Sequence, residues 1–92
     1  MSDPESMSMS RVLAEYAPGD GGTWLQEFAW MALHSSRKLR GLALSIEEIG
    51  VQRPILLGDD GRVWDGHHRI LIATDVGMEG VPVVHAQEVR DE

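Results

Sequence analysis

The chain has 92 residues, of which 42% are hydrophobic and 25% are charged, and these proportions are typical of one small folded domain. It contains no cysteine, which excludes disulfide bonds, thiolate metal ligands and a cysteine nucleophile. The formal net charge of −7 opposes general attraction to DNA, because duplex-binding domains depend on a basic face that displaces counterions.

The acidic excess is not spread evenly along the chain. Residues 1–36 and 70–92 each sum to −4, whereas residues 37–69 hold six basic and five acidic residues and sum to +1. The middle of the chain therefore leaves room for a local basic pocket. Apolar runs of about four residues are far shorter than a membrane span of roughly 18, and the start lacks the basic and apolar parts of a secretory signal. We expect a cytoplasmic protein with no membrane partner.

The first third of the chain predicts a flexible start, one undecided short element and a helix. Residues 1–10 are rich in Ser, Met, Asp and Pro without an apolar period, which predicts a flexible N-terminus followed by a single domain over 11–92. Residues 11–16 fit either a short strand or one helical turn before the breaking sequence at 18–22. Thr23 and Gln26 form a capping-box pattern, which predicts a helix over about 23–34.

Apolar residues cover about 200° of this helix, which is wider than a single core-facing stripe. The excess apolar surface leaves two interpretations open. In the first, Trp24, Trp30 and Met31 form an interface for a second copy or another protein, since exposed aromatic residues tend to anchor interfaces. In the second, the small domain wraps Trp30 partly under its own N-terminus.

The second half of the chain predicts a helix, a hairpin, a helix and a strand. Leu39, Leu42, Ile46 and Ile49 mark an amphipathic helix that Gly50 can end. Residues 54–57 and 62–64 fit a hairpin around a Gly-Asp-Asp-Gly turn.

The chain then turns into a helix over about 67–76, which Gly77 closes, and a strand over 81–85. Pro82 favours an edge position for that strand, because proline lacks the backbone N–H that a central ladder uses. The order strand, helix, strand favours a right-handed crossover to a parallel neighbour. We therefore expect an α/β fold with a short mixed sheet flanked by two or three helices.

The segment Asp65-Gly66-His67-His68-Arg69 lies where a predicted strand ends and a helix begins. Free backbone N–H groups and the positive end of the helix dipole favour an anion at such a point. Gly66 permits close approach, Arg69 can bind phosphate with a planar fork, and each imidazole can donate or transfer a proton. The plain alternative is that Asp65 caps the helix and the histidines are exposed.

Four motifs of this chain resemble the ParB/sulfiredoxin superfamily over roughly residues 38–85. They are, in chain order, Leu42-x-x-Ser45-Ile46-x-x-x-Gly50-x-x-x-Pro54-Ile55, Asp60-Gly61-Arg62-Val63-Trp64-Asp65-Gly66-His67-His68-Arg69-Ile70, Gly77 and Val81-Pro82-Val83. In that superfamily a Gly-x-x-Arg turn at a helix start holds a nucleoside triphosphate, which is CTP in ParB proteins and ATP in sulfiredoxins. The resemblance implies that Gly66, His67, His68 and Arg69 bind phosphate, with magnesium accompanying the nucleotide and no other cofactor.

Two departures from the superfamily bear on activity. His67 stands where sulfiredoxins carry their reactive cysteine, which excludes sulfinic acid reduction by that route. ParB proteins carry Gly-Glu-Arg-Arg at this turn, so His67 and His68 replace its acidic and first basic members. The partner domains of a DNA-clamping ParB are not expected either, which favours a stand-alone regulator of phage or mobile-element type over a DNA-partition protein.

Three functions follow from these patterns. The preferred one is a nucleotide-binding module in which Arg69 and the backbone bind phosphate, His68 donates to it and His67 is the candidate proton carrier. If the protein is an enzyme, it is a nucleotide hydrolase or a ParB-like nuclease with His67 and His68 as catalytic residues. The third is a protein-interaction module that acts through the Trp24, Trp30 and Met31 surface.

Metal ligands and neighbouring charges complete the interpretation. A metal-dependent nuclease would draw its ligands from a set of acidic and imidazole side chains: Asp59, Asp60, Asp65, His67 and His68. Consecutive histidines on a helix point about 100° apart, so no metal site is predicted. Arg53 and Arg62 either extend the positive pocket around Arg69 or are ordinary solvated side chains.

Overall fold

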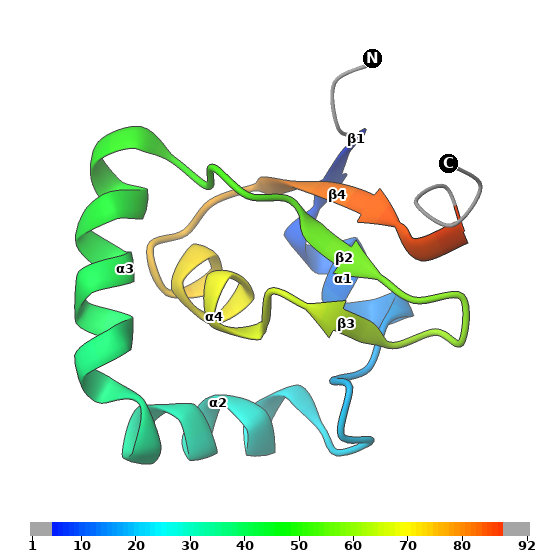
Figure 1. Cartoon of the computed structure of the whole chain (residues 1–92), viewed down its shortest axis with the longest axis horizontal. Helices are drawn as coiled ribbons and strands as arrows, with labels where there is room; N and C mark the ends of the chain where they lie inside the picture. The colour runs from blue at the N-terminus through cyan, green and yellow to red at the C-terminus, as the bar shows by residue number, and fades with distance from the viewer. Residues whose placement is uncertain (1–4, 88–92) are drawn as a thin grey trace.

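The structure of the protein is a computed structural model, and it describes residues 5–87. Its elements are β1 (Glu5–Ser8), α1 (Met9–Glu15), α2 (Trp24–His34), α3 (Ser36–Ile49), β2 (Ile55–Leu57), β3 (Val63–Asp65), α4 (His67–Asp75) and β4 (Gly80–His85). The strands form one sheet of order β1-β4-β2-β3, in which β2 and β4 are parallel and the other neighbours are antiparallel. The predicted α/β fold with a short mixed sheet is confirmed, and α1 adds a helix that the sequence left undecided (Figure 1).

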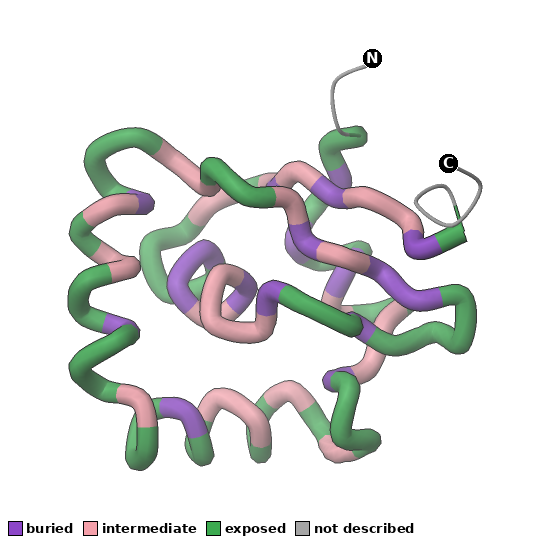
Figure 2. The backbone as a smooth tube through the Cα atoms, viewed as in Figure 1, coloured by how far each residue is buried: buried purple, intermediate pink, exposed green. Residues whose placement is uncertain are grey.

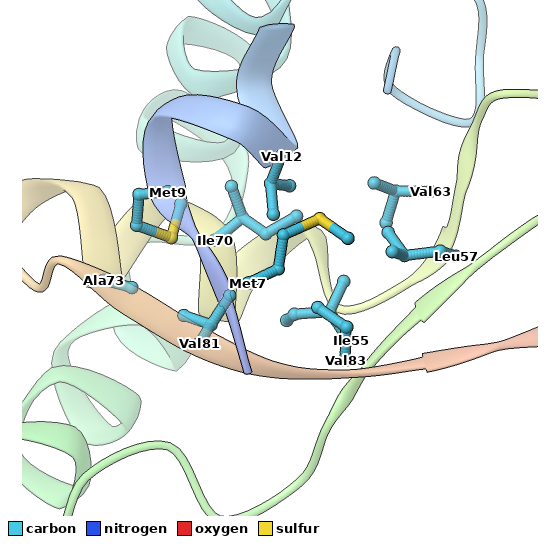
Figure 3. Close-up of a cluster of buried hydrophobic side chains, with 10 residues drawn as sticks. All are labelled: Met7, Met9, Val12, Ile55, Leu57, Val63, Ile70, Ala73, Val81 and Val83. Carbon is cyan, nitrogen blue, oxygen red and sulfur yellow. The ribbon is translucent and has the colours of Figure 1, made fainter. Parts of the chain in front are cut away.

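One face of the sheet carries the main core. Alternate residues of a strand point to opposite faces, and the buried residues of the four strands meet on the face that α1 and α4 cover (Figure 3). The ten buried members of this cluster are Met7, Met9, Val12, Ile55, Leu57, Val63, Ile70, Ala73, Val81 and Val83. The same apolar contacts therefore fix β3, which precedes α4, and β4, which follows it.

The N-terminal strand corrects the expectation of a flexible start. Residues of β1 pair with β4 from Glu5 opposite Val83 to Ser8 opposite Gly80, and Met7 is only 3% exposed. The flexible-start prediction is wrong for residues 5–10, while residues 1–4 lie outside the described part of the chain. The prediction failed because a four-residue strand is too short to show an apolar period. The strand is stabilised by a partner strand more than 70 residues away in the chain.

Met7→Ala is expected to lower the free energy of unfolding by about 2–4 kcal/mol, because it removes a buried side chain and leaves a cavity in the main core. Ser6→Ala, on the exposed side of the same strand, is the matched control and should change it by less than about 0.5 kcal/mol. Urea denaturation followed by far-UV circular dichroism measures both. Equal stability of the two variants would show that β1 is not part of the folded core.

Helices α2 and α3 form an L around α4 (Figure 1). The predicted capping box is confirmed at the start of α2, where the Thr23 side chain accepts from the Gln26 N–H and the Gln26 side chain accepts from the Thr23 N–H. A second buried cluster joins the three helices and consists of Met31, Leu39, Ile46 and Ile72. This cluster fixes the distance of α2 and α3 from the start of α4.

The tryptophan and methionine surface predicted on α2 is not one surface. Met31 is fully buried in the second cluster, and it is the buried residue of α2. Most of α2 is otherwise intermediate or exposed (Figure 2). Trp24 packs against the main core and donates from Nε1 to the carbonyl of Tyr16 at 2.8 Å. The interface prediction is wrong for Met31, because the broad apolar surface of α2 faces two cores at once. For Trp24, which is half-buried, it stays a prediction. Trp30 is 56% exposed and stays a candidate.

The position of β4 corrects two further expectations. β4 lies between β1 and β2 and not at an edge, although it contains Pro82. The ladder with β2 begins one residue later, at Val83 opposite Ile55, so Pro82 lies outside that ladder. The parallel neighbour of β4 is β2 and not β3, since β3 first returns antiparallel to β2. No helix among residues 5–87 is long and apolar enough to cross a membrane.

Candidate anion-binding site

The turn from β3 into α4 is built around Gly66. Its φ of 113° lies in the left-handed region, and a Cβ at this position would lie 2.7 Å from Ile55 Cδ1 and 3.1 Å from Arg69 Nη2. Gly66 is the N-cap residue of α4, and no side chain caps the helix. Asp65 does not cap it, contrary to the plain alternative considered above. The first turn of α4 therefore presents backbone N–H groups without a side-chain acceptor.

Arg69 is held against this turn. Its Nη2 lies 3.3 Å from Asp65 Oδ2, and its side chain is only 13% exposed. The Nε atom is buried and has no hydrogen-bond partner among residues 5–87. A buried charged donor without an acceptor is unfavourable, so this N–H is suited to donate a hydrogen bond to an oxygen atom of a ligand.

His68 carries a second buried nitrogen of the same kind. Its Nε2 has no hydrogen-bond partner in the described part of the chain. Burial lowers the pKa of His68, and the positive charges of Lys38, His67 and Arg69 lower it further. The neutral imidazole is thereby favoured, and in the tautomer with the proton on Nε2 it can still donate one hydrogen bond.

His67 has a structural partner. Its Nε2 accepts a hydrogen bond of 2.9 Å from the backbone N–H of Gly19, and its ring centroid lies 5.9 Å from that of Trp24. A Cβ on Gly19 would lie 2.8 Å from the Val63 carbonyl oxygen, so the close approach of this loop requires a glycine. His67 thus anchors the loop before α2, and its Nε2 is not free to bind phosphate. Its role as a proton carrier stays a prediction.

The folded state is expected to lose stability as the pH falls, because burial lowers the pKa of His67 below its ordinary value of 6.5, although Asp20 and Asp65 oppose the shift. The unfolded chain then binds the proton more readily, so this contribution is complete above about pH 6.5 and is lost as the pH falls toward the folded-state pKa. His67→Gln retains an acceptor for Gly19 and cannot titrate. Urea denaturation at pH 7.5 and 5.5 should show a smaller loss for this variant than for the unaltered chain; an equal loss would contradict the account.

The side chains of His67, His68 and Arg69 line one pocket of about 520 Å³. Its walls come from α2, α3, the segment before β2 and the start of α4. The lining residues are Glu27, Trp30, Met31, Lys38, Leu42, Arg53, Asp65, Gly66, His67, His68 and Arg69. Three Lys or Arg side chains therefore face two carboxylates, which gives a formal +1 in a chain of −7.

The electrostatics of the pocket favour an anion more than this count implies. Burial raises the pKa of Glu27, and its hydrogen bond with Asp20 raises the pKa further, so Glu27 is less readily ionised than an ordinary glutamate. Asp65 is paired with Arg69. The positive charges of Lys38 and Arg53 are thus opposed only weakly inside the pocket.

The structure brings together all four predicted phosphate-binding residues and adds Trp30. Of the two arginines suggested as extensions of the pocket, Arg53 lines it and Arg62 does not. Lys38 was missed, since no local motif marks it and it reaches the pocket only through the packing of α3. Among residues 5–87 no three His, Asp or Glu side chains lie together as a metal site. Asp60 instead accepts from the Arg62 N–H and from Trp64 Nε1.

Comparison with known proteins places the chain in a family. No family model matches the chain. The chain is 32% identical over 59 residues to the ParB-like nuclease domain-containing protein YnaK of Escherichia coli strain K12, which covers 64% of this chain and 68% of YnaK. The structure is similar to that of a Pnob8-like ParB-N domain, with a TM-score of 0.60 and 22% identity over 95% of this chain. The chain spans only 31% of that second protein.

The mixed sheet, the four helices and the glycine turn before α4 define a small α/β domain of the ParB-N type. The chain belongs to the ParB-like superfamily, as the relation to YnaK shows.

Proposed function

We propose that the chain binds a nucleoside triphosphate with magnesium in the pocket at the start of α4. The observation that carries this proposal is the pair of buried nitrogens, Arg69 Nε and His68 Nε2, which have no partner among residues 5–87 and belong to residues that line one basic pocket. A buried polar group without a partner costs about 1–3 kcal/mol. An anion that accepts from both nitrogens would remove this cost at two places.

Each part of the turn has a separate task in this proposal. The backbone N–H groups after Gly66 and the Arg69 Nε–H bind phosphate oxygens, while Asp65 holds the other end of the guanidinium. His68 donates from Nε2 as a neutral imidazole. Lys38 and Arg53 supply charge from the walls of the pocket. A nucleotide-controlled regulator is favoured over a hydrolase, because the Nε2 of the candidate proton carrier His67 is engaged by Gly19.

DNA cleavage is a second candidate, and the observation in its favour is the word nuclease in the name of YnaK. Metal-dependent cleavage would require ligands for a divalent ion near the attacked phosphate. The side chains between residues 5 and 87 do not bring three such ligands together. Incubation of supercoiled plasmid with the protein and magnesium or manganese tests this candidate separately.

Calorimetric titration of the full chain with CTP, ATP, GTP and UTP, with and without magnesium, tests the proposal. We expect saturable binding of at least one nucleotide. Arg69→Ala should weaken this binding, and Arg40→Ala is its matched control. Arg40 is exposed on α3, about 200° around the helix from Lys38, and it does not line the pocket. Absence of binding up to millimolar nucleotide, in protein whose circular dichroism shows a folded chain, would overturn the proposal.

A further inference from the structure

Trp30 lines the same pocket as His68 and Arg69, although it lies on a different helix. Glu27, Trp30 and Met31 stand at i, i+3 and i+4 on α2, which places them along one face of that helix. Met31 continues into the buried cluster, while the Trp30 side chain stays 56% exposed. The indole is thus a large apolar surface that neither core uses.

The indole is also restrained on the helix. Its ring centroid lies 4.8 Å from that of His34, with the two ring planes tilted by 36°. His34 stands one turn later on α2, so the contact holds the indole from within the same rigid element. A restrained, exposed aromatic ring loses little freedom when a flat group packs on it.

We propose that Trp30 is the platform on which the base of the bound nucleotide stacks. This inference rests on the proposed function and adds the residue that contacts the base, which is the part that distinguishes a nucleotide from an inorganic polyphosphate. The pocket of about 520 Å³ has the size of sites that enclose small organic ligands. Its two buried, unpaired nitrogens come from the start of α4, whereas its apolar wall of Trp30 and Leu42 comes from α2 and α3.

An inorganic phosphate chain would use the donors and leave the apolar wall exposed to water. A nucleotide uses both, and stacking of a base on an aromatic side chain strengthens binding by about 5- to 150-fold. Stacking tolerates every base, since each base has an aromatic face. The platform therefore accounts for a preference in binding of nucleotide over inorganic polyphosphate. It does not select among CTP, ATP, GTP and UTP.

The test compares inorganic tripolyphosphate with the nucleotide that binds most tightly, both with magnesium, on the full chain. Trp30→Ala is expected to weaken nucleotide binding by about 5- to 150-fold and to leave the affinity for tripolyphosphate unchanged. Trp30→Phe retains a ring and should keep most of the nucleotide affinity. Leu25→Ala removes an apolar side chain of the same helix that is 79% exposed and does not line the pocket, so it should change neither affinity.

Four results would overturn the inference. Equal affinity of the unaltered chain for tripolyphosphate and nucleotide, or an unchanged nucleotide affinity of Trp30→Ala, would remove the platform while leaving the phosphate site intact. Loss of a self-associated species in Trp30→Ala by size-exclusion chromatography, with unchanged nucleotide affinity, would assign Trp30 to an interface between copies. Absence of binding by both ligands would overturn this inference together with the proposed function.

Discussion

Gly66→Ala is expected to lower the free energy of unfolding by about 2–5 kcal/mol, the largest loss that we predict for a single methyl group in this chain. The left-handed backbone costs a residue with a Cβ about 1–2 kcal/mol. The new Cβ would also lie 2.7 Å from Ile55 Cδ1 and 3.3 Å from Ile55 Cα, and relief of such an overlap costs about 1–3 kcal/mol more. Urea denaturation measures the sum.

Gly61→Ala separates the two contributions. Gly61 also has a positive φ of 79°, but a Cβ there would have no heavy atom within 4 Å. We expect this control to lose about 1–2 kcal/mol, which is the backbone part alone. If Gly66→Ala lost no more than Gly61→Ala, the close packing of the turn against β2 would be contradicted.

Arg69→Ala is expected to weaken nucleotide binding by about 10- to 100-fold, because hydrogen bonds to charged groups contribute about 1.5–3 kcal/mol each. Its effect on folding should be small, about 1 kcal/mol or less, since the ion pair that it removes is to the largely exposed Asp65 and the unpaired buried donor disappears with it. Calorimetric titration and urea denaturation of the same preparation measure the two quantities.

Arg69→Lys is the informative companion of this variant. It retains the positive charge but lacks the Nε–H and the planar fork, so its affinity should fall between those of Arg69→Ala and the unaltered chain. An Arg69→Ala variant that binds nucleotide as tightly as Arg40→Ala would contradict the role of Arg69. A variant that fails to fold would contradict the expected stability.

The parts of the fold that sequence predicts depend on short-range signals. The Thr23–Gln26 capping box fixes the start of α2, and glycines follow the ends of α3 and α4. The hairpin of β2 and β3 is indicated by a turn sequence between two apolar runs. The residues of the Gly66–Arg69 turn were found together because they are contiguous. Each of these signals lies within a few residues of the feature that it predicts.

The parts that sequence did not predict depend on contacts between distant segments. Strand β1 is defined by its pairing with β4, and the burial of Met31 is defined by the packing of α2 against α3 and α4. Lys38 and Trp30 reach the pocket for the same reason, since neither stands near the Gly66 turn in sequence. Trp30 was marked as part of the excess apolar surface of its helix, but only the fold shows what it lies beside.

The Nε–H of Arg69 offers the most direct test of the central claim, that a nucleotide phosphate is bound by the buried donors at the start of α4. Its resonance can be assigned in a ¹H–¹⁵N NMR spectrum by comparison with Arg69→Lys, and then followed while CTP or ATP is added with magnesium. The account predicts a saturable shift of this resonance at the nucleotide concentrations that calorimetry defines. An unchanged Arg69 Nε–H at saturating nucleotide, with shifts confined to other parts of the protein, would contradict it.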